Sequence, residues 1–182
     1  MNPKLTASPG AFRSKGEVVL ERTLQAPTET VWRFLTEPAL LATWLAGGTL
    51  DPRPGGRVAL DFRLLDCPGR EGASGTVSGV VTAFDPPRRL AYSWDESGQG
   101  RPAEQCSEIA FELSPAADGA THLRLIHRRA SAAEACGLAA GWHLHLDLLI
   151  ARLDGRPAFD FMAAYGRLTP EYERAHAALR DT

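Results

Sequence analysis

The stretch VVLERTLQAPTETVWRFLTEPALLATW, residues 18–44, places three elements in an uncommon order. Apolar and polar residues alternate at its start, which predicts a strand over 17–25. The strand ends before Pro27, because proline has no N–H group for a sheet hydrogen bond. Helical spacing then predicts a helix over 28–37 and, after a second proline, another short helix over 39–45. The fold therefore begins with one strand followed at once by two short helices.

Length and composition limit the class of protein. The 182 residues suit one domain, and 44% hydrophobic residues are enough for a core. The net charge of −2 gives no long-range attraction to nucleic acid, and the Arg88-Arg89 and Arg128-Arg129 pairs are too few for such a surface. No apolar run approaches the ~18 residues of a membrane span, and the N-terminus lacks the apolar core of a secretory signal. We therefore expect a cytoplasmic protein with no nucleic-acid and no membrane partner.

Alternating apolar and polar residues continue beyond the two short helices, in segments separated by short turns. Because consecutive strands joined by short turns pair antiparallel, we expect one antiparallel sheet of six strands. From residue 131 to about 154 the apolar spacing becomes helical. A last short helix is expected over 171–180, because Thr169-Pro170 is a helix-start signal. The five further strands are expected over 57–64, 75–84, 90–94, 109–113 and 123–127.

The residue types that carry common catalytic and metal chemistry do not form a motif. Cys67, Cys106 and Cys136 include no CxxC pair, so we expect reduced thiols rather than a disulfide framework or a zinc-thiolate site. The sequence has no GxSxG elbow, no HExxH and no phosphate-binding glycine loop. Asp61 and Asp95 fall on polar strand faces and are expected to be solvated carboxylates. We therefore assign no catalytic residue, no metal and no cofactor.

Three histidines bear on a possible site. His143 and His145 of the long helix are two residues apart and point in different directions, so they cannot supply two metal ligands from one helix face. His143 and Asp147 are expected to touch on the solvent side. His145 lies in the apolar stripe, and His127 ends a strand on the face of its leucines, so both could border an interior space. Core histidines, ligand recognition, and catalysis or metal binding all stay open for this pair.

The aromatic residues are expected to converge between the sheet and the long helix. Most inward aromatic side chains belong to a plain core, and that interpretation stays open here. A sheet curled around one helix can nevertheless leave its interior unfilled, and an apolar lining with a few polar groups is what a small-molecule pocket needs. The six converging residues are Trp44, Phe62, Tyr92, Trp94, Phe111 and Trp142.

The segment APTETVWRFLTEPALLATW resembles the opening motif of the START-like (SRPBCC, helix-grip) superfamily. Within it, the resemblance is to bacterial proteins related to the C-terminal domain of the activator of the heat-shock protein 90 ATPase. The PGG turn at 54–56, the segment from Gly79 through PPRRL to Trp94, the strand ending in His127 and the GWxxxLxxLxxxL helix over 141–153 also fit in order and spacing. Together these motifs cover roughly residues 17–155.

This resemblance implies an α+β fold, in which a curved six-stranded antiparallel sheet wraps around a long C-terminal helix and two short helices lie between strands 1 and 2. It also implies a cavity between sheet and helix. Family members bind lipids, polyketides or other hydrophobic molecules; some are enzymes and some bind proteins. Carried over to this chain, the cavity would be lined by Phe62, Tyr92, Trp94, Phe111, His127, Trp142, His145, Leu146 and Leu149, with Trp44 near its mouth.

We expect a protein that binds a small, largely hydrophobic molecule and is not an enzyme. Two alternatives stay open. One is a protein-interaction module or chaperone co-factor, and the other is a cavity enzyme of cyclase or hydrolase type that uses His127 or His145 as general acid or base. We divide the chain into a flexible N-terminal tail over 1–16, a START-like domain over 17–155 and a C-terminal helical extension over 156–182. The extension could cover the back of the long helix or form a homodimer contact.

Overall fold

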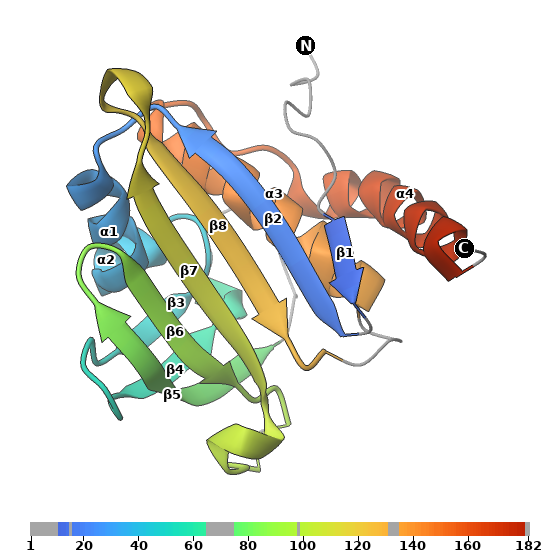
Figure 1. Cartoon of the computed structure of the whole chain (residues 1–182), viewed down its shortest axis with the longest axis horizontal. Coiled ribbons are helices and arrows are strands. Elements are labelled where there is room, and N and C mark those ends of the chain that lie inside the picture. The colour runs from blue at the N-terminus through green and yellow to red at the C-terminus, as the bar shows by residue number, and fades with distance from the viewer. Residues whose placement is uncertain (1–10, 15, 65–74, 98, 131–134, 181–182) are drawn as a thin grey trace.

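The computed structural model describes residues 11–14, 16–64, 75–97, 99–130 and 135–180. These residues form an α+β fold, in which a single antiparallel sheet curves around a long helix (Figure 1). The helix-grip arrangement implied by the resemblance is therefore confirmed. None of the helices in these described ranges is both long and apolar enough to cross a lipid bilayer.

The elements follow the order expected for this fold. The strands are β1 (Ala11–Ser14), β2 (Glu17–Leu24), β3 (Gly47–Leu50), β4 (Arg57–Asp61), β5 (Thr76–Asp85), β6 (Arg89–Trp94), β7 (Ser107–Pro115) and β8 (Thr121–Arg128). The α-helices are α1 (Thr28–Thr36), α2 (Pro38–Leu41), α3 (Ala135–Leu153) and α4 (Phe161–Arg180), and the short 3-10 helices are η1 (Phe62–Leu64), η2 (Ala103–Gln105) and η3 (Ala117–Gly119).

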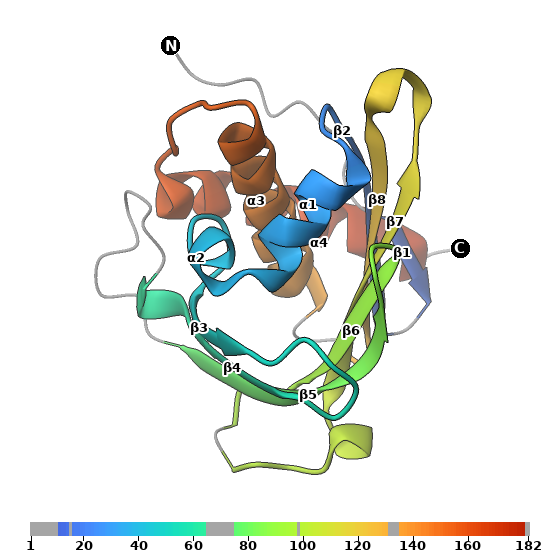
Figure 2. The ribbon, with the colours of Figure 1, turned by 90° about the vertical axis from the view of Figure 1, so that its left-hand side faces the viewer.

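The sheet has the strand order β1-β2-β8-β7-β6-β5-β4-β3, with every neighbouring pair antiparallel. The first long strand therefore pairs with the last one, and α1 and α2 carry the chain from β2 to β3 at the far edge of the sheet. Figure 2 shows α3 inside the curve of the sheet, with α1 and α2 beside it and α4 crossing behind it.

The expected strand count of six is wrong, because the sheet has eight strands. β1 lies within the segment expected to be a flexible tail, of which residues 1–10 fall outside the described residues. β3 begins at Gly47-Gly48, soon after the segment 39–45 in which the second short helix was expected, and was not expected as a strand. Gly48 has a φ of 126°, and a Cβ there would lie 2.1 Å from the carbonyl oxygen of Ala59 on β4. The glycine is thus needed for the close approach of the edge strand β3 to β4.

Both C-terminal helices differ from their expected bounds. α3 is described from Ala135, so the expected helix start at 131–134 lies outside the described residues. α4 begins at Phe161 rather than near Thr169, and Pro170 lies inside it. A proline inside a helix removes one backbone hydrogen bond. Contacts with α3 offset this cost, because α4 buries Phe161, Ala164, Leu168 and Tyr172.

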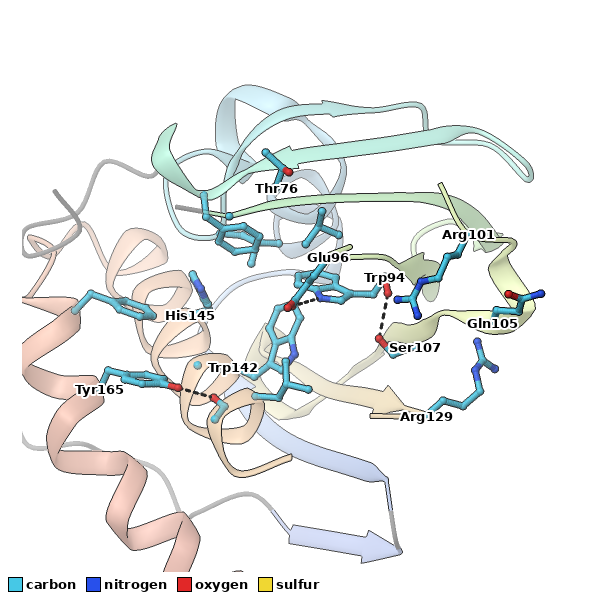
Figure 3. Close-up of a pocket in the computed structure, with 18 residues that line it drawn as sticks. Thr76, Trp94, Glu96, Arg101, Gln105, Ser107, Arg129, Trp142, His145 and Tyr165 are labelled. Atoms are coloured by element: carbon cyan, nitrogen blue, oxygen red, sulfur yellow. Dashed lines mark hydrogen bonds between the residues drawn. The ribbon is translucent and has the colours of Figure 1, made fainter. Parts of the chain in front are cut away.

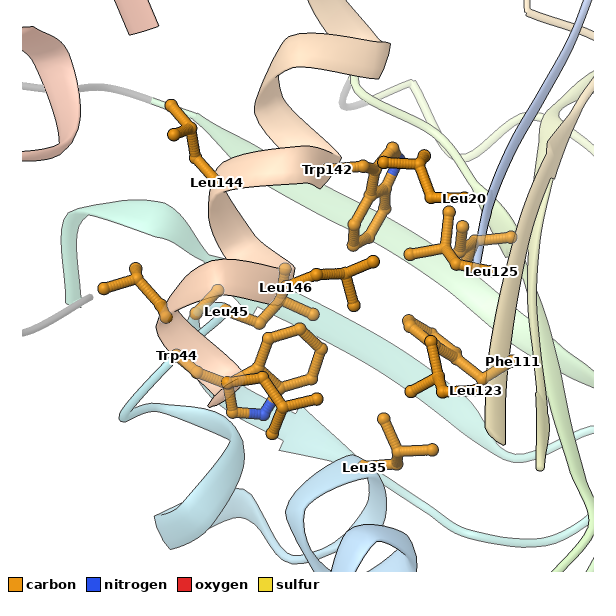
Figure 4. Close-up of a cluster of buried hydrophobic side chains, with 14 of the residues drawn as sticks. Leu20, Leu35, Trp44, Leu45, Phe111, Leu123, Leu125, Trp142, Leu144 and Leu146 are labelled. Carbon is orange, nitrogen blue, oxygen red and sulfur yellow. The ribbon is translucent and has the colours of Figure 1, made fainter. Parts of the chain in front are cut away.

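The main core lies between α3 and the concave face of the sheet (Figure 4). Trp44, Phe111 and Leu146 meet there, and all three are at most 1% exposed. Phe111 comes from β7 and Leu146 from α3, whereas Trp44 lies in the turn that follows α2. Trp44 also donates a hydrogen bond from its indole N–H to the carbonyl of Phe34, at 2.9 Å. The insertion of two short helices is therefore anchored in the same core as α3.

We expect Gly79→Ala to destabilise the sheet, because a Cβ on Gly79 would lie 1.9 Å from the carbonyl oxygen of Ser93. Either β5 or β6 must move to admit the methyl group, and such overpacking costs about 1–3 kcal/mol. Urea denaturation of the variant measures the loss. Gly75→Ala is the matched control, because nothing lies within 4 Å of a Cβ at that position. Equal stability of the two variants would contradict the prediction.

Candidate functional site

A cavity of about 980 Å³ lies between the concave face of the sheet and the helices α3 and α4 (Figure 3). One wall comes from the 3-10 helix after β4 and from the ends of β5 and β6. Gly137, Leu138, Gly141, Trp142 and His145 of α3 form the facing wall, and Phe161 and Tyr165 of α4 close its side. The loop that joins β6 to β7, together with the end of β8, forms the remaining edge.

Five rings make a continuous aromatic surface inside this cavity. The ring centroids of Trp94 and Trp142 are 5.2 Å apart, and those of Phe62 and Trp94 are 5.9 Å apart. His145 continues the surface, with its ring 5.7 Å from Phe62 and 4.8 Å from Phe161. These rings come from four separate elements of the chain, so the surface exists only in the folded protein.

The indole N–H groups of Trp94 and Trp142 both donate hydrogen bonds to other side chains. The indole N–H of Trp94 donates to Oε1 of Glu96 at 2.7 Å, and that of Trp142 donates to Nδ1 of His127 at 2.9 Å. An indole has only this one polar atom. Both side chains are therefore held in place by hydrogen bonds and present ring carbons to the cavity.

His127 is held by hydrogen bonds at both ring nitrogens. Because the indole of Trp142 can only donate, Nδ1 of His127 must accept, and the neutral ring then carries its proton on Nε2. Nε2 lies 2.9 Å from Oγ of Ser107, and that hydroxyl donates to the carbonyl of Trp94 at 3.2 Å. This chain of hydrogen bonds gives His127 a positioning role: it orients Trp142.

His145 differs from His127 because its ring belongs to the cavity wall. Its Nδ1 lies 2.8 Å from the carbonyl oxygen of Trp44, and since a carbonyl only accepts, Nδ1 is the donor. Nε of Arg152 donates to the neighbouring carbonyl of Thr43 at 2.9 Å. Two side chains of α3 thus hold the turn after α2, which fixes one edge of the cavity.

The structure places four of the ten expected lining residues in the cavity wall: Phe62, Trp94, Trp142 and His145. The other six are buried in the core around it: Trp44, Tyr92, Phe111, His127, Leu146 and Leu149. The expected position of Trp44 near the mouth is wrong, because Trp44 is fully buried and packs edge-on against Phe111. Periodicity identified the inward face but could not separate wall from core. Ligand binding by any of these residues stays a prediction.

Tyr92 was expected to line the cavity but is buried behind its wall. Its ring stacks beside that of Trp94, with centroids 6.3 Å apart, yet Tyr92 is not part of the cavity wall. The hydroxyl group has no hydrogen-bond partner among the described residues, and burial raises the pKa of Tyr92. Tyr92 is therefore a neutral core residue behind the aromatic surface.

The polar edge of the cavity is the part that the sequence did not reveal. Asp95 was expected to be solvated but is buried. Hydrogen bonds from the hydroxyl and backbone N–H of Ser97, and then from Arg101, hold the pKa of Asp95 well below its usual range. These bonds fold the loop back and place Arg101 at the edge of the cavity, beside Gln105 and Arg129. A loop without periodicity offers no signal for such an arrangement.

His143 is also placed differently from the expectation. It is 1% exposed rather than on the solvent side, because α4 covers this face of α3. Nδ1 of His143 lies 2.9 Å from the hydroxyl of Tyr172, and Nε2 lies 3.5 Å from Oδ2 of Asp147. The expected contact between His143 and Asp147 exists, but it is a buried one.

The structure also bears on metal binding. Within the described parts of the chain, no three His, Cys, Asp or Glu side chains are grouped to hold a metal ion. Cys106 and Cys136 are unpaired thiols, and Cys67 lies outside the described residues. The cavity wall therefore offers aromatic carbon, one histidine and the polar edge residues.

Comparison with known proteins assigns the chain to a family. Residues 25–154 match the family model described as "Activator of Hsp90 ATPase homolog 1-like protein". The chain belongs to this family. The family resemblance stated from the sequence is thereby confirmed, together with membership of the SRPBCC/START-like superfamily. The match ends before α4, so Phe161 and Tyr165 of the cavity wall lie outside it. A comparison with curated proteins gives no match.

Solved structures agree with the family assignment. The protein encoded by gene BPP1335 of Bordetella parapertussis is 32% identical, with a TM-score of 0.70 over 95% of this chain and 94% of that chain. CalU16 from Micromonospora echinospora is 25% identical, with a TM-score of 0.67 over 88% of each chain. Protein MLL2253 from Mesorhizobium loti is 28% identical, with a TM-score of 0.63 over 78% of this chain and 98% of that one.

Proposed function

We propose that this protein binds a small, largely hydrophobic molecule in the cavity between the sheet, α3 and α4. The observation that carries the proposal is the aromatic surface of Trp94 and Trp142, whose indole N–H groups both already donate to other side chains. A flat apolar guest would remove this surface from water at a gain of about 25 cal/mol per Å². A volume of about 980 Å³ suits a molecule of drug-like size.

The arrangement of the histidines favours binding over acid–base chemistry. His127 uses both ring nitrogens in hydrogen bonds that orient Trp142 and Ser107. A general base must reach the proton that it removes, and His127 is not part of the cavity wall. Of the two histidines considered from the sequence, only His145 lies in the wall, and its Nδ1 holds the turn after α2.

The test is to fill part of the cavity with a larger side chain on α3. Gly141 lies in the wall, and a Cβ there would meet no atom within 4 Å. We expect Gly141→Leu to fold, because leucine favours a helix more than glycine does, while its side chain takes the place of a guest. The measurement is the fluorescence of N-phenyl-1-naphthylamine, an uncharged aromatic probe, titrated at micromolar concentrations. We expect saturable binding to the natural protein and at least about tenfold weaker binding to the variant.

Gly166→Leu is the matched control, since Gly166 lies on α4, is exposed and also has no atom within 4 Å of a Cβ. It makes the same change in a helix outside the cavity wall, so probe affinity should stay that of the natural protein. Absence of saturable binding to the natural protein would refute the proposed function. Equal affinity in a folded Gly141→Leu variant would refute the assigned cavity.

A further inference from the structure

The two guanidinium groups that line the cavity lie at one end of its aromatic surface (Figure 3). Arg101, Gln105 and Arg129 lie together at one end, and His145 and Tyr165 lie at the other (Figure 3). Arg101 and Gln105 belong to the loop between β6 and β7, whereas Arg129 directly follows β8. A guest that fills the cavity would therefore meet aromatic carbon along its length and guanidinium groups at one end.

The side chain of Arg129 is held in place by backbone carbonyls. Its Nε donates to the carbonyl of Cys106 at 2.8 Å, and its Nη2 lies 3.5 Å from the carbonyl of Ala103. Arg129 also has a φ of 60°, a left-handed conformation that costs free energy in a residue other than glycine. The fold thus retains a strained backbone that turns this guanidinium toward the loop at the end of the cavity.

The two guanidinium groups differ in their charge balance. Nη2 of Arg101 lies 3.1 Å from Oδ1 of the buried Asp95, so this pair is close to neutral as a unit. Arg129 bonds only to carbonyls, and no carboxylate of the described residues forms an ion pair with it. Arg129 is therefore the cation at this end that is left to bind an anionic group. An arginine in a fixed orientation is well suited to a carboxylate or sulfonate, because its N–H groups match two oxygens at once.

We propose that the guest is amphipathic: an aromatic body rests on Trp94 and Trp142, and an anionic group, a carboxylate or sulfonate, is bound at Arg129. The orientation follows from Glu96, whose carboxylate accepts from the indole of Trp94 and repels a second anion at the aromatic surface. Gln105, beside Arg129, adds an amide that can donate to the same anionic group. This inference rests on the proposed function and names the chemical class of the guest.

The experiment compares two probes with one aromatic frame. 8-Anilinonaphthalene-1-sulfonate carries a sulfonate, and N-phenyl-1-naphthylamine is the same frame without it. Fluorescence titration of the natural protein should give tighter binding for the sulfonate probe. Raising the salt concentration should weaken binding of the sulfonate probe, because salt screens an exposed charge pair. The affinity for the neutral probe should stay unchanged.

Arg129→Gln should weaken binding of the sulfonate probe by roughly tenfold and leave the neutral probe unchanged. Arg129→Lys keeps the charge without the planar fork, so it should recover part of the affinity. Arg57→Gln is the control: it removes the same charge from an exposed residue of β4 outside the cavity wall, and both affinities should stay the same. Thermal unfolding of each variant verifies that it folds.

The outcomes separate this inference from the proposed function. Saturable binding of both probes with equal affinity, or an equal response of both to Arg129→Gln, would overturn the anionic guest and leave the hydrophobic cavity standing. Loss of sulfonate affinity in Arg57→Gln as well would overturn the role of Arg129, since net charge would then explain it. Binding of neither probe would overturn both proposals.

Discussion

A chain that ends after Gly155 should lose most of its stability. Such a truncation removes α4, which buries Phe161, Leu168 and Tyr172 at 2% exposure or less. Burying three such side chains contributes on the order of 5 kcal/mol or more, and a domain is stable by only about 5–15 kcal/mol. Truncation also uncovers His143, which Tyr172 now holds by a hydrogen bond. Circular dichroism and urea denaturation should show a chain that is unfolded or unfolds at low denaturant.

This result would differ from what the family match alone indicates, because the match ends at residue 154. A cooperative thermal transition of the truncated chain near that of the whole chain would contradict the prediction. Two substitutions test the same contact without deletion. Leu168→Ala should cost about 2–4 kcal/mol, whereas Met162→Ala on the same helix should cost little, because Met162 is 46% exposed.

The strands and helices in which apolar residues recur at regular spacing could be predicted from the sequence. Alternation located β2, β4, β5, β6, β7 and β8, and helical spacing located α1 and α3, because each of these elements turns one apolar face to the core. β3 shows no such alternation and was not expected; its residues form a strand through their pairing with β4. Short edge strands depend on their partner, so a local signal does not specify them.

For the candidate site, the local sequence pattern predicted which side chains of a strand or helix face inward. Trp94 and Trp142 were placed on inward faces, which the structure confirms. Asp95 and His143 were expected to meet solvent, but each is covered by a segment outside the strand or helix whose pattern gave that expectation. For Asp95 the cover is its own loop through Ser97 and Arg101, and for His143 it is α4. Tertiary packing decides whether a polar group is buried. The periodicity of apolar residues and the secondary-structure propensity of a segment do not determine that packing.

Asp147→Ala should be the most damaging single substitution among the polar residues of the core. Arg22 of β2 is 6% exposed, and its Nε and Nη2 have no hydrogen-bond partner among the described residues. Burial lowers the pKa of Arg22, and the negative charge of Asp147 is the largest influence that opposes this shift. Without Asp147 a buried guanidinium is left without its main counter-charge. Leaving a buried cation uncompensated in this way costs several kcal/mol, which urea denaturation can measure.

A double-mutant cycle separates the missing charge from lost packing. Arg22→Leu should cost less than Asp147→Ala, because Asp147 keeps His143 at 3.5 Å as a partner and leucine refills part of the apolar volume. The double variant should then be more stable than Asp147→Ala alone, since no unpaired buried cation remains. Additive losses in the double variant would mean that Arg22 and Asp147 do not interact. Losses below about 0.5 kcal/mol in both single variants would mean that water, rather than Asp147, compensates the buried guanidinium.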